Sequence, residues 1–175
     1  VWFCAGQSNM AATVADAKDK EKEIAAGDDY PQIRLYSVSK WGSFAAKPQD
    51  NAGGKWLVCS ADTVTSFSAV GYFFGRALAD TTLKGVPIGL IDAGRGATRI
   101  ESWIDRGVLA KHFNMADMRV SAFGATISSC YNGMVYPVMP YGIRGVLWYQ
   151  GESNASRPNQ YVDLFKVMVK DWRKR

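Results

Sequence analysis

A serine follows the first apolar segment of the chain. Residues Val1–Ala5 are apolar and β-prone, which is typical of a strand buried on both faces, and Gly6 interrupts the run. Ser8 comes two residues later, between Gln7 and Asn9. A serine hydroxyl at the end of a strand is a candidate nucleophile for acyl transfer, provided that a base accepts its proton. Taken alone, Ser8 is more typical of a helix N-cap.

Two further segments combine glycine with polar side chains after an apolar run. Residues 92–99 read DAGRGATR, and residues 149–154 read YQGESN. Small residues let a substrate approach the backbone, and exposed N–H groups stabilise an oxyanion. Gly96 is a candidate N–H donor, and Gln150 or Asn154 is a candidate side-chain donor.

Each of these segments also has a simpler interpretation. The GRG of residues 94–96 is typical of a turn or a phosphate-binding loop, although it lacks the G-x-G-x-x-G spacing of a dinucleotide site. Residues 150–154 could cap the helix that Pro158 begins. Three such segments at equivalent strand ends favour a shared site, because parallel sheets bind ligands at the carboxyl ends of their strands.

The elements that must position these residues alternate between strands and helices. The expected strands are Val1–Ala5, Ile33–Val38, Val86–Ile91 and Ile143–Tyr149. The expected helices are Asp16–Ala26, Ser66–Leu83, Ile100–Leu109 and Pro158–Arg173, and 39–55 is expected to be a loop. This alternation predicts an α/β fold with a parallel sheet and helices on both faces.

The apolar side chains of the two longest helices predict which faces are buried. In the first helix the expected stripe contains Val70, Phe73, Phe74, Ala77 and Leu78. In the last helix it contains Leu164, Phe165, Val167, Met168 and Trp172. In the sheet we expect Val1–Ala5 in the centre, flanked by Ile33–Val38 and Val86–Ile91, with Ile143–Tyr149 beyond the latter.

Composition narrows the class of protein. With 175 residues, 47% apolar and 21% charged, the chain is expected to form a single globular domain, 1–175, incomplete at both ends. The net charge of +5 comes mostly from five basic residues and one acidic residue in 166–175, which is typical of a solvated helix end rather than of a nucleic-acid site. No apolar run reaches the ~18 residues of a membrane span.

The potential metal ligands are few and scattered. Cys4, Cys59 and Cys130 are too few for a disulfide framework, and they do not have the spacing of a zinc site. No other ligand cluster is present, so we expect neither a metal nor another cofactor.

Several segments resemble one enzyme family. The segments VWFCAGQSNM, GLIDAGRGATRIESW and GVLWYQGESNA resemble SGNH-type hydrolases of the sialate O-acetylesterase and acetyl-xylan esterase branch. The segments FSAVGYFFGRAL, YNGMVYP and LFKVMVKDWRKR are also similar to that family. The resemblance implies a three-layer α/β/α domain with a flavodoxin-like sheet of about five strands. It also implies a serine esterase that removes O-acetyl groups from a carbohydrate such as sialic acid or acetylated xylan.

The resemblance also implies roles for individual residues. Ser8 matches the nucleophile, and the oxyanion donors would be the Ser8 N–H, the Gly96 N–H and the Gln150 side chain. Residues expected to bind substrate or to shape the site are Gln7, Asn9, Arg95, Glu152 and Asn154. Among these, Arg95 (or its neighbour Arg99) could pair with the carboxylate of a sialic acid.

One part of the family pattern is missing. The family carries its base in an Asp-x-x-His segment after a further strand, and no such motif occurs in the 175 residues. His112 is the only histidine, and it has Leu109 three positions before it, so we expect it to be a surface or structural residue. The chain is therefore expected to lack the last strand, to leave the edge of the Ile143–Tyr149 strand exposed, and to need a C-terminal fragment or a second chain.

Two other functions stay open at this point. A carbohydrate-binding module could keep the shape of the site but lack the base, and a nucleotide-binding protein could use the GRG loop. The resemblance favours a secreted or periplasmic location over a cytoplasmic one, while the cysteine count does not decide the compartment.

Overall fold

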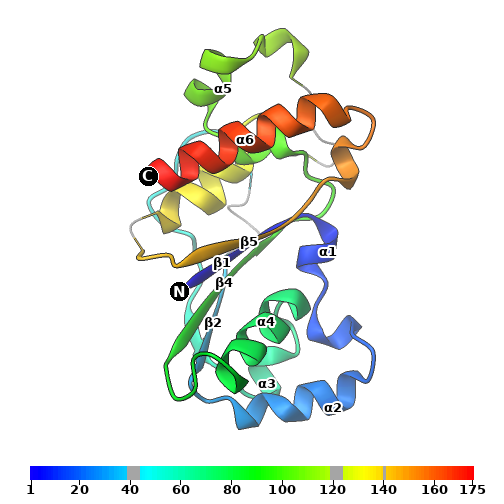
Figure 1. The fold of residues 1–175 in the computed structure, drawn as a ribbon, viewed down its shortest axis with the longest axis vertical. Coiled ribbons are helices and arrows are strands. Elements are labelled where there is room, and N and C mark those ends of the chain that lie inside the picture. Colours follow the sequence, from blue (N-terminus) through cyan, green and yellow to red (C-terminus); the bar gives the residue numbers. More distant parts are fainter. Residues whose placement is uncertain (39–43, 119–123, 140) are drawn as a thin grey trace. The chain divides into compact units, whose positions relative to one another are not determined.

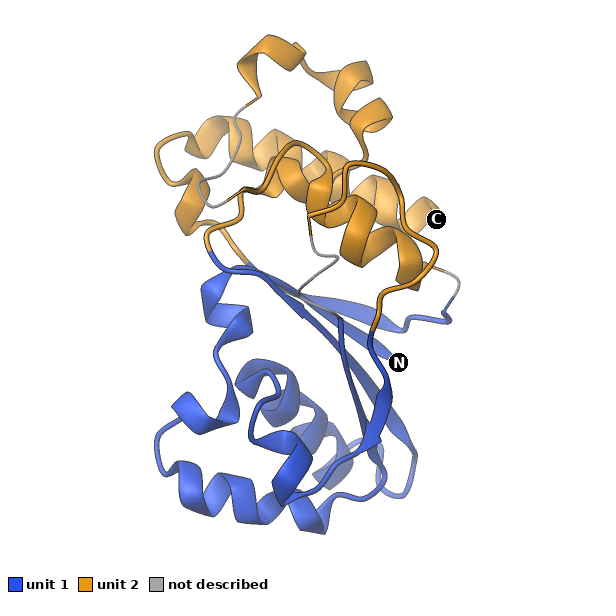
Figure 2. Cartoon of the chain, turned by 180° about the vertical axis from the view of Figure 1, so that it is seen from behind, with its two compact units in different colours: residues 1–38, 54–96, 141–149 blue, residues 39–53, 97–140, 150–175 orange. Residues whose placement is uncertain are grey.

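The computed structural model describes residues 1–38, 44–118, 124–139 and 141–175 (Figure 1). These residues form two compact units, which are described separately (Figure 2). Unit 1 contains Val1–Val38, Gly54–Gly96 and Tyr141–Tyr149, and unit 2 contains Ser39–Gly53, Ala97–Pro140 and Gln150–Arg175.

Unit 1 is built on a five-stranded sheet in the order β3-β2-β4-β1-β5. The strands are β1 (Trp2–Gly6), β2 (Ile33–Ser37), β3 (Trp56–Val58), β4 (Ile88–Gly94) and β5 (Gly145–Tyr149). All neighbours pair in parallel except β3, which runs antiparallel to β2. The predicted α/β class is confirmed, and all four predicted strands are present.

The predicted strand order is wrong in one respect. β2 pairs with β4, although we expected it beside β1. β5 pairs with β1, although we expected it beside β4. The central strands are short apolar runs, and such runs carry no pattern that identifies their neighbours.

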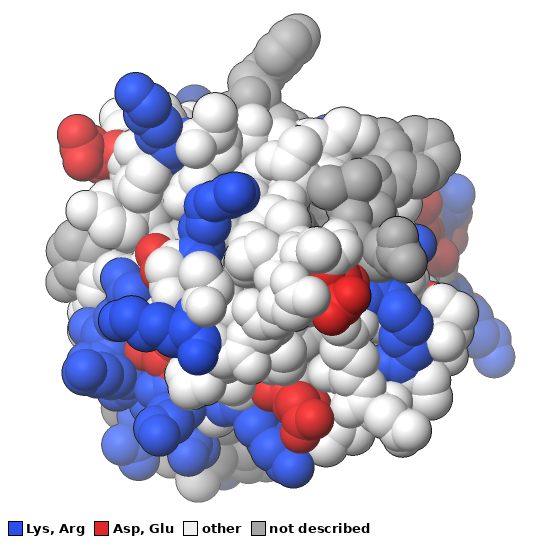
Figure 3. Space-filling view, turned by 90° about the horizontal axis from the view of Figure 1, so that it is seen from above, with Lys and Arg blue, Asp and Glu red and all other residues white. Residues whose placement is uncertain are grey.

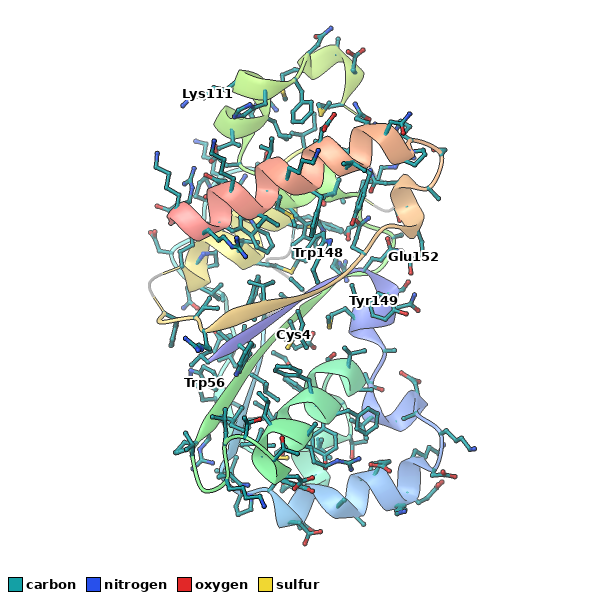
Figure 4. The ribbon with its side chains drawn as sticks, viewed as in Figure 1. Cys4, Trp56, Lys111, Trp148, Tyr149 and Glu152 are labelled. Carbon is teal, nitrogen blue, oxygen red and sulfur yellow. The ribbon has the colours of Figure 1, made fainter. Side chains whose placement is uncertain are left out.

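The edge strand β3 was not predicted. It has only three residues and follows a glycine-rich segment. The ring of Trp56, labelled in Figure 4, has its centroid 5.2 Å from that of Tyr36 and 6.1 Å from that of Tyr141. These contacts join residues distant in sequence, so local pattern does not reveal them.

The register of the sheet aligns the strand ends that precede the polar segments. Gly6 of β1 pairs with Gly94 of β4 and with Tyr149 of β5. The φ of Gly6 is +151°, and a Cβ at this position would lie 2.1 Å from the Tyr149 carbonyl oxygen. Glycine is therefore required where β1 ends, and the chain leaves all three strands at one level.

Four α-helices belong to unit 1, namely α1 (Ser8–Ala11), α2 (Lys20–Ala25), α3 (Ala61–Val64) and α4 (Ala69–Asp80). Figure 1 shows α2, α3 and α4 on the same side of the sheet. The helix predicted over Asp16–Ala26 is shorter than expected, because Asp19 has a left-handed backbone with a φ of 57° and α2 begins after it. A 3₁₀ turn then continues over Ala26–Asp29, beyond the predicted end of the helix at Ala26.

The apolar pattern predicted part of the buried face of α4: Phe73, Phe74 and Leu78 are partly buried and pack against the core. The buried residues of α4 are Gly71, Tyr72, Gly75 and Ala79, whereas Ala77 is exposed. A Cβ on Gly75 would lie 2.7 Å from the Leu90 Cδ1 atom of β4, so the helix approaches the sheet closely at this glycine. The prediction missed the part of the face that lies closest to the sheet, because apolar periodicity does not count glycines.

The described residues of unit 2 form two α-helices, α5 (Arg106–His112) and α6 (Pro158–Lys174). Short helical turns of unit 2 are η4 (Ile100–Trp103), η5 (Met115–Asp117), η6 (Tyr131–Val135), η7 (Tyr136–Val138) and η8 (Glu152–Asn154). The single helix predicted over Ile100–Leu109 is wrong, because Ile104 is extended and Asp105 starts a new helix by accepting a hydrogen bond from the Val108 N–H at 3.0 Å. A polar N-cap side chain of this kind ends one element and begins the next.

The last helix largely follows its prediction. Leu164 and Met168 of α6 are buried, but Phe165 is 36% exposed. Its basic residues Lys166, Lys170, Arg173 and Lys174 are exposed. Lysine and arginine are prominent on the surface drawn in Figure 3, and Lys166 is paired only with the equally exposed Asp163, at 3.6 Å. This supports a solvated helix end.

The three cysteines are buried and form no disulfide with one another. Burial raises the pKa of the Cys4 thiol to about 12, with a further contribution from the charge of Asp92. Burial likewise raises the pKa of Cys59 to about 11. Because only the thiolate is a strong nucleophile, neither group competes with Ser8 for acyl chemistry near neutral pH.

We therefore expect the native protein to resist thiol reagents and to lose stability in alkali. Unfolded thiols ionise near pH 9 whereas the folded Cys4 ionises only near 12, so the unfolded state binds fewer protons between these values and the free energy of unfolding falls as pH rises. Titration with a chromogenic disulfide should detect all three thiols in denaturant and almost none in the native protein. Rapid reaction of one native thiol at pH 8 would contradict this account.

Candidate active site

Ser8 is the first residue of α1 and its side chain is exposed. The N–H groups of Met10 and Ala11 donate to the Gln7 carbonyl at 3.0 Å, and the Ala12 N–H donates to the Ser8 carbonyl at 2.9 Å. These bonds hold a short helical turn directly after β1. Within unit 1, no described side chain hydrogen-bonds to the Ser8 hydroxyl, which leaves its oxygen open to an incoming carbonyl.

Backbone hydrogen bonds tie the polar segments to the strand ends. The Gln7 N–H donates to the Tyr149 carbonyl at 2.9 Å, and the Arg95 N–H donates to the Gly6 carbonyl at 2.9 Å. Gln7 is 4% exposed, so it anchors the turn, whereas Asn9 is exposed beside Ser8. Figure 4 labels Tyr149 at the end of β5.

Gly96 lies beside Ser8, as the sequence predicts. A Cβ built on Gly96 would lie 3.9 Å from the Cβ of Ser8, and Gly96 is exposed. The fold of unit 1 therefore brings together the predicted nucleophile and one predicted oxyanion donor, from segments about ninety positions apart in the chain.

Gln150 belongs to unit 2, where its side chain is largely buried. Its Nε2 donates to the Thr98 carbonyl at 3.0 Å and to the Asn154 Oδ1 at 2.9 Å. The backbone carbonyl of Gln150 accepts a hydrogen bond from the Tyr161 hydroxyl at 2.8 Å. The Gln150 amide thus has a defined position relative to Thr98 and Asn154.

Two charged residues of this region were missed by sequence reasoning. Glu101 of η4 is fully buried and pairs with Arg157 at 2.6 Å. The other Glu101 oxygen accepts a hydrogen bond from the Asn154 Nδ2 at 2.8 Å. The one available signal was an acidic residue beside Ile100 and Trp103 in an apolar segment, which is consistent with a buried, paired carboxylate.

The remaining predicted residues lie at the surface or at its margin. Glu152, labelled in Figure 4, is exposed at the start of η8. Arg95 is partly buried in unit 1, and Arg99 is partly buried in unit 2, where its Nε donates to the Ser153 carbonyl at 3.1 Å. His112 is exposed in the last turn of α5, with its ring centroid 6.5 Å from that of Phe113. This agrees with the interpretation of His112 as a surface residue.

The part of the chain that the structure describes contains no group of three or more histidine, cysteine or acidic residues arranged to hold a metal ion. Among its helices, none has the length and apolar character to span a bilayer.

Alignments with similar proteins cover almost the whole chain. Sialate O-acetylesterase from Mus musculus is 32% identical over an alignment that covers 99% of this chain and 38% of that protein. The human sialate O-acetylesterase is 29% identical, with 99% of this chain and 35% of that protein covered. The chain thus spans less than two fifths of the length of these curated relatives.

Solved structures agree with this relationship. A structure described as a novel carbohydrate acetylesterase from Xanthomonas citri matches with a TM-score of 0.85 and 33% identity, over 99% of this chain and 37% of that one. A protein from Arabidopsis thaliana shares the fold, with a TM-score of 0.55, 19% identity, and coverage of 99% of this chain and 68% of that one. The family model for carbohydrate esterases described as sialic acid-specific acetylesterases matches residues 1–175, and the chain therefore belongs to that family.

Proposed function

We propose that the chain carries the nucleophile of a serine esterase that releases acetate from an O-acetylated carbohydrate. The observation that supports this most strongly is the exposed Ser8 at the start of α1, with Gly96 beside it. A Cβ built on Gly96 would lie 3.9 Å from the Ser8 Cβ. Membership of the acetylesterase family supports acetyl as the acyl group.

The reaction proceeds by acyl transfer in two halves. The Ser8 Oγ attacks the acetyl carbonyl while a base takes its proton, and the sugar hydroxyl leaves with that proton. Water then attacks the acetyl-Ser8 ester and releases acetate. The negative oxygen of each tetrahedral intermediate accepts hydrogen bonds from the Ser8 N–H, the Gly96 N–H and the Gln150 amide, which supply the electrostatic stabilisation.

The base comes from outside these 175 residues in this proposal. The chain has a single histidine, His112, which is exposed on α5. A C-terminal segment or a second chain carrying Asp-x-x-His supplies the base and the carboxylate that orients it. β5 offers a place for this segment, because none of the described strands pairs with its outer edge, where Val146 and Tyr149 are 43% and 46% exposed.

The proposed substrate is an O-acetylated sialic acid, since the matching family and the mammalian relatives are named for it. The test is acetate release from an O-acetylated sialoside and from acetylated xylan, measured in parallel. Faster turnover of the sialoside supports the proposal. Faster turnover of acetylated xylan would contradict it and would make the protein an acetyl-xylan esterase. Binding of either sugar without any acetate release favours a carbohydrate-binding module.

Substitution of Gln150 by alanine is expected to lower kcat by about 10²–10³-fold, the usual loss for one oxyanion donor. The measurement is steady-state hydrolysis of an acetyl ester by the active form of the protein. Gln49→Ala is the matched control in unit 2, because the Gln49 side chain is exposed and donates only to the Lys47 carbonyl. An unchanged kcat in Gln150→Ala would remove this residue from the mechanism.

A further inference from the structure

A buried carboxylate lies in the same hydrogen-bond network as Gln150. Both side-chain oxygens of Glu101 are engaged, one by Arg157 at 2.6 Å and one by the Asn154 Nδ2 at 2.8 Å. Glu101 is fully buried, whereas the Arg157 side chain is 22% exposed. A charge buried this deeply is retained only where its partners are complete, and here they are.

The carboxylate determines how the Asn154 amide is oriented. A carboxylate only accepts hydrogen bonds, so the Asn154 nitrogen must face it and the Asn154 oxygen must face the opposite way. That oxygen accepts from the Ile100 N–H at 3.0 Å and from the Gln150 Nε2 at 2.9 Å. A reversed Asn154 would place oxygen against oxygen at Glu101 and N–H against N–H at Ile100.

The orientation of Asn154 in turn determines that of Gln150. The Gln150 nitrogen faces the Asn154 Oδ1 and the Thr98 carbonyl, and both of these are acceptors. A reversed Gln150 amide would present its own oxygen to both. The Glu101 carboxylate therefore fixes the orientation of the Asn154 amide, and Asn154 in turn fixes the position of the Gln150 side-chain nitrogen.

We propose that Glu101, paired with Arg157 and acting through Asn154, is the positioning residue for the side-chain amide of Gln150. This inference rests on the proposed function, in which the Gln150 amide donates to the oxyanion. Since both Nε2 hydrogens already have acceptors, the bond to the oxyanion is a shared, three-centre one, which depends closely on where the nitrogen lies. A displacement of about 1 Å in such a group costs on the order of 10²-fold in rate.

The decisive experiment is a double-mutant cycle between Glu101→Gln and Gln150→Ala. Glutamine has nearly the same shape as glutamate but can donate as well as accept, so Asn154 is free to reverse. Glu101→Gln is expected to lower kcat on the order of 10-fold to 100-fold with KM unchanged, because Glu101 acts only through the donor. In the Gln150→Ala background the same change is expected to have no further effect.

The cycle separates this inference from the proposed function. Additive losses would overturn the positioning role, because Glu101 would then act independently of Gln150. A Gln150→Ala variant with full activity would instead refute the donor role in the proposed function. Glu23→Gln is the matched control, since it removes a Glu–Arg pair with Arg76 in unit 1 and is expected to leave kcat unchanged.

A second variant guards against loss of folding. Glu101→Gln combined with Arg157→Met removes both charges, so that no charge is left without its partner. It is expected to reproduce the fall in kcat of Glu101→Gln while unfolding cooperatively. Wild-type kcat in this folded double variant would overturn the proposal.

A measurement on the 175-residue chain needs no catalytic activity. Proton exchange of the Gln150 side-chain amide, followed by NMR, is expected to be slow and to accelerate about 10-fold or more in Glu101→Gln. The exposed Gln49 amide is the internal reference and is expected to be unaffected. Unchanged exchange at Gln150 in Glu101→Gln would show that the carboxylate does not hold this amide.

Discussion

Ser8→Ala is expected to lower acetyl ester turnover by about 10⁶-fold in the active form of the protein, the loss seen when a serine esterase or protease loses its nucleophile. The substitution removes the oxygen that forms the acetyl-enzyme, and no other described group of unit 1 replaces it. Cys4, the nearest chemical alternative in β1, is buried and has a pKa raised to about 12.

Folding is expected to be almost unaffected by this substitution. Ser8 is exposed and its hydroxyl makes no hydrogen bond within unit 1, so the free energy of unfolding should change by less than about 0.5 kcal/mol. The measurements are initial rates of acetate release and mass spectrometry of the protein during turnover, which should reveal an acetyl group on Ser8. Ser66→Ala is the control, as another exposed serine of unit 1. Normal turnover by Ser8→Ala would refute the proposed mechanism.

Addition of a segment that carries Asp-x-x-His is expected to raise turnover by this chain up to about 10⁶-fold, the cost of removing a catalytic histidine. A neutral serine hydroxyl is a weak nucleophile, and it gains its reactivity from a base that is itself oriented. The chain alone should retain only the residual rate, roughly 10³–10⁴ over water, that oxyanion stabilisation and binding supply.

The measurement compares the 175-residue chain with and without the C-terminal segment of a homologous esterase, joined covalently or added as a peptide. The same segment with its histidine changed to alanine is the matched control and should restore nothing. His112→Ala should leave turnover unchanged, because His112 is exposed at the end of α5. Full turnover by the chain alone, abolished by His112→Ala, would make His112 the base and overturn the proposal.

Local sequence was sufficient for those features that depend on neighbouring residues. The apolar run before Gly6 predicted β1, and the placement of Ser8 at its end followed directly. The period of apolar residues predicted α6 to within one residue, because a long amphipathic helix repeats its pattern over several turns. The nearness of Ser8 and Gly96 is not a local feature, and it was predicted from a general rule of topology, that the carboxyl ends of parallel strands meet at one edge of a sheet.

The tertiary structure decided what depends on contacts between distant residues. Strand pairing decides the order of β1, β2 and β4, and ring packing supports β3. A short apolar run does not indicate which strand it will pair with. The close approach of α4 depends on Gly75, whose missing side chain leaves no apolar signal.

The Glu101 network is the clearest case. By type and position alone, Glu101 and Arg157 are two ordinary charged residues more than fifty positions apart. Only the fold of unit 2 buries the carboxylate between Arg157 and Asn154. The sequence therefore indicates which side chains can perform acyl chemistry, because that depends on residue type and local spacing. The groups that hold those side chains in place are selected by burial and hydrogen bonding across the chain, which become visible only once it is folded.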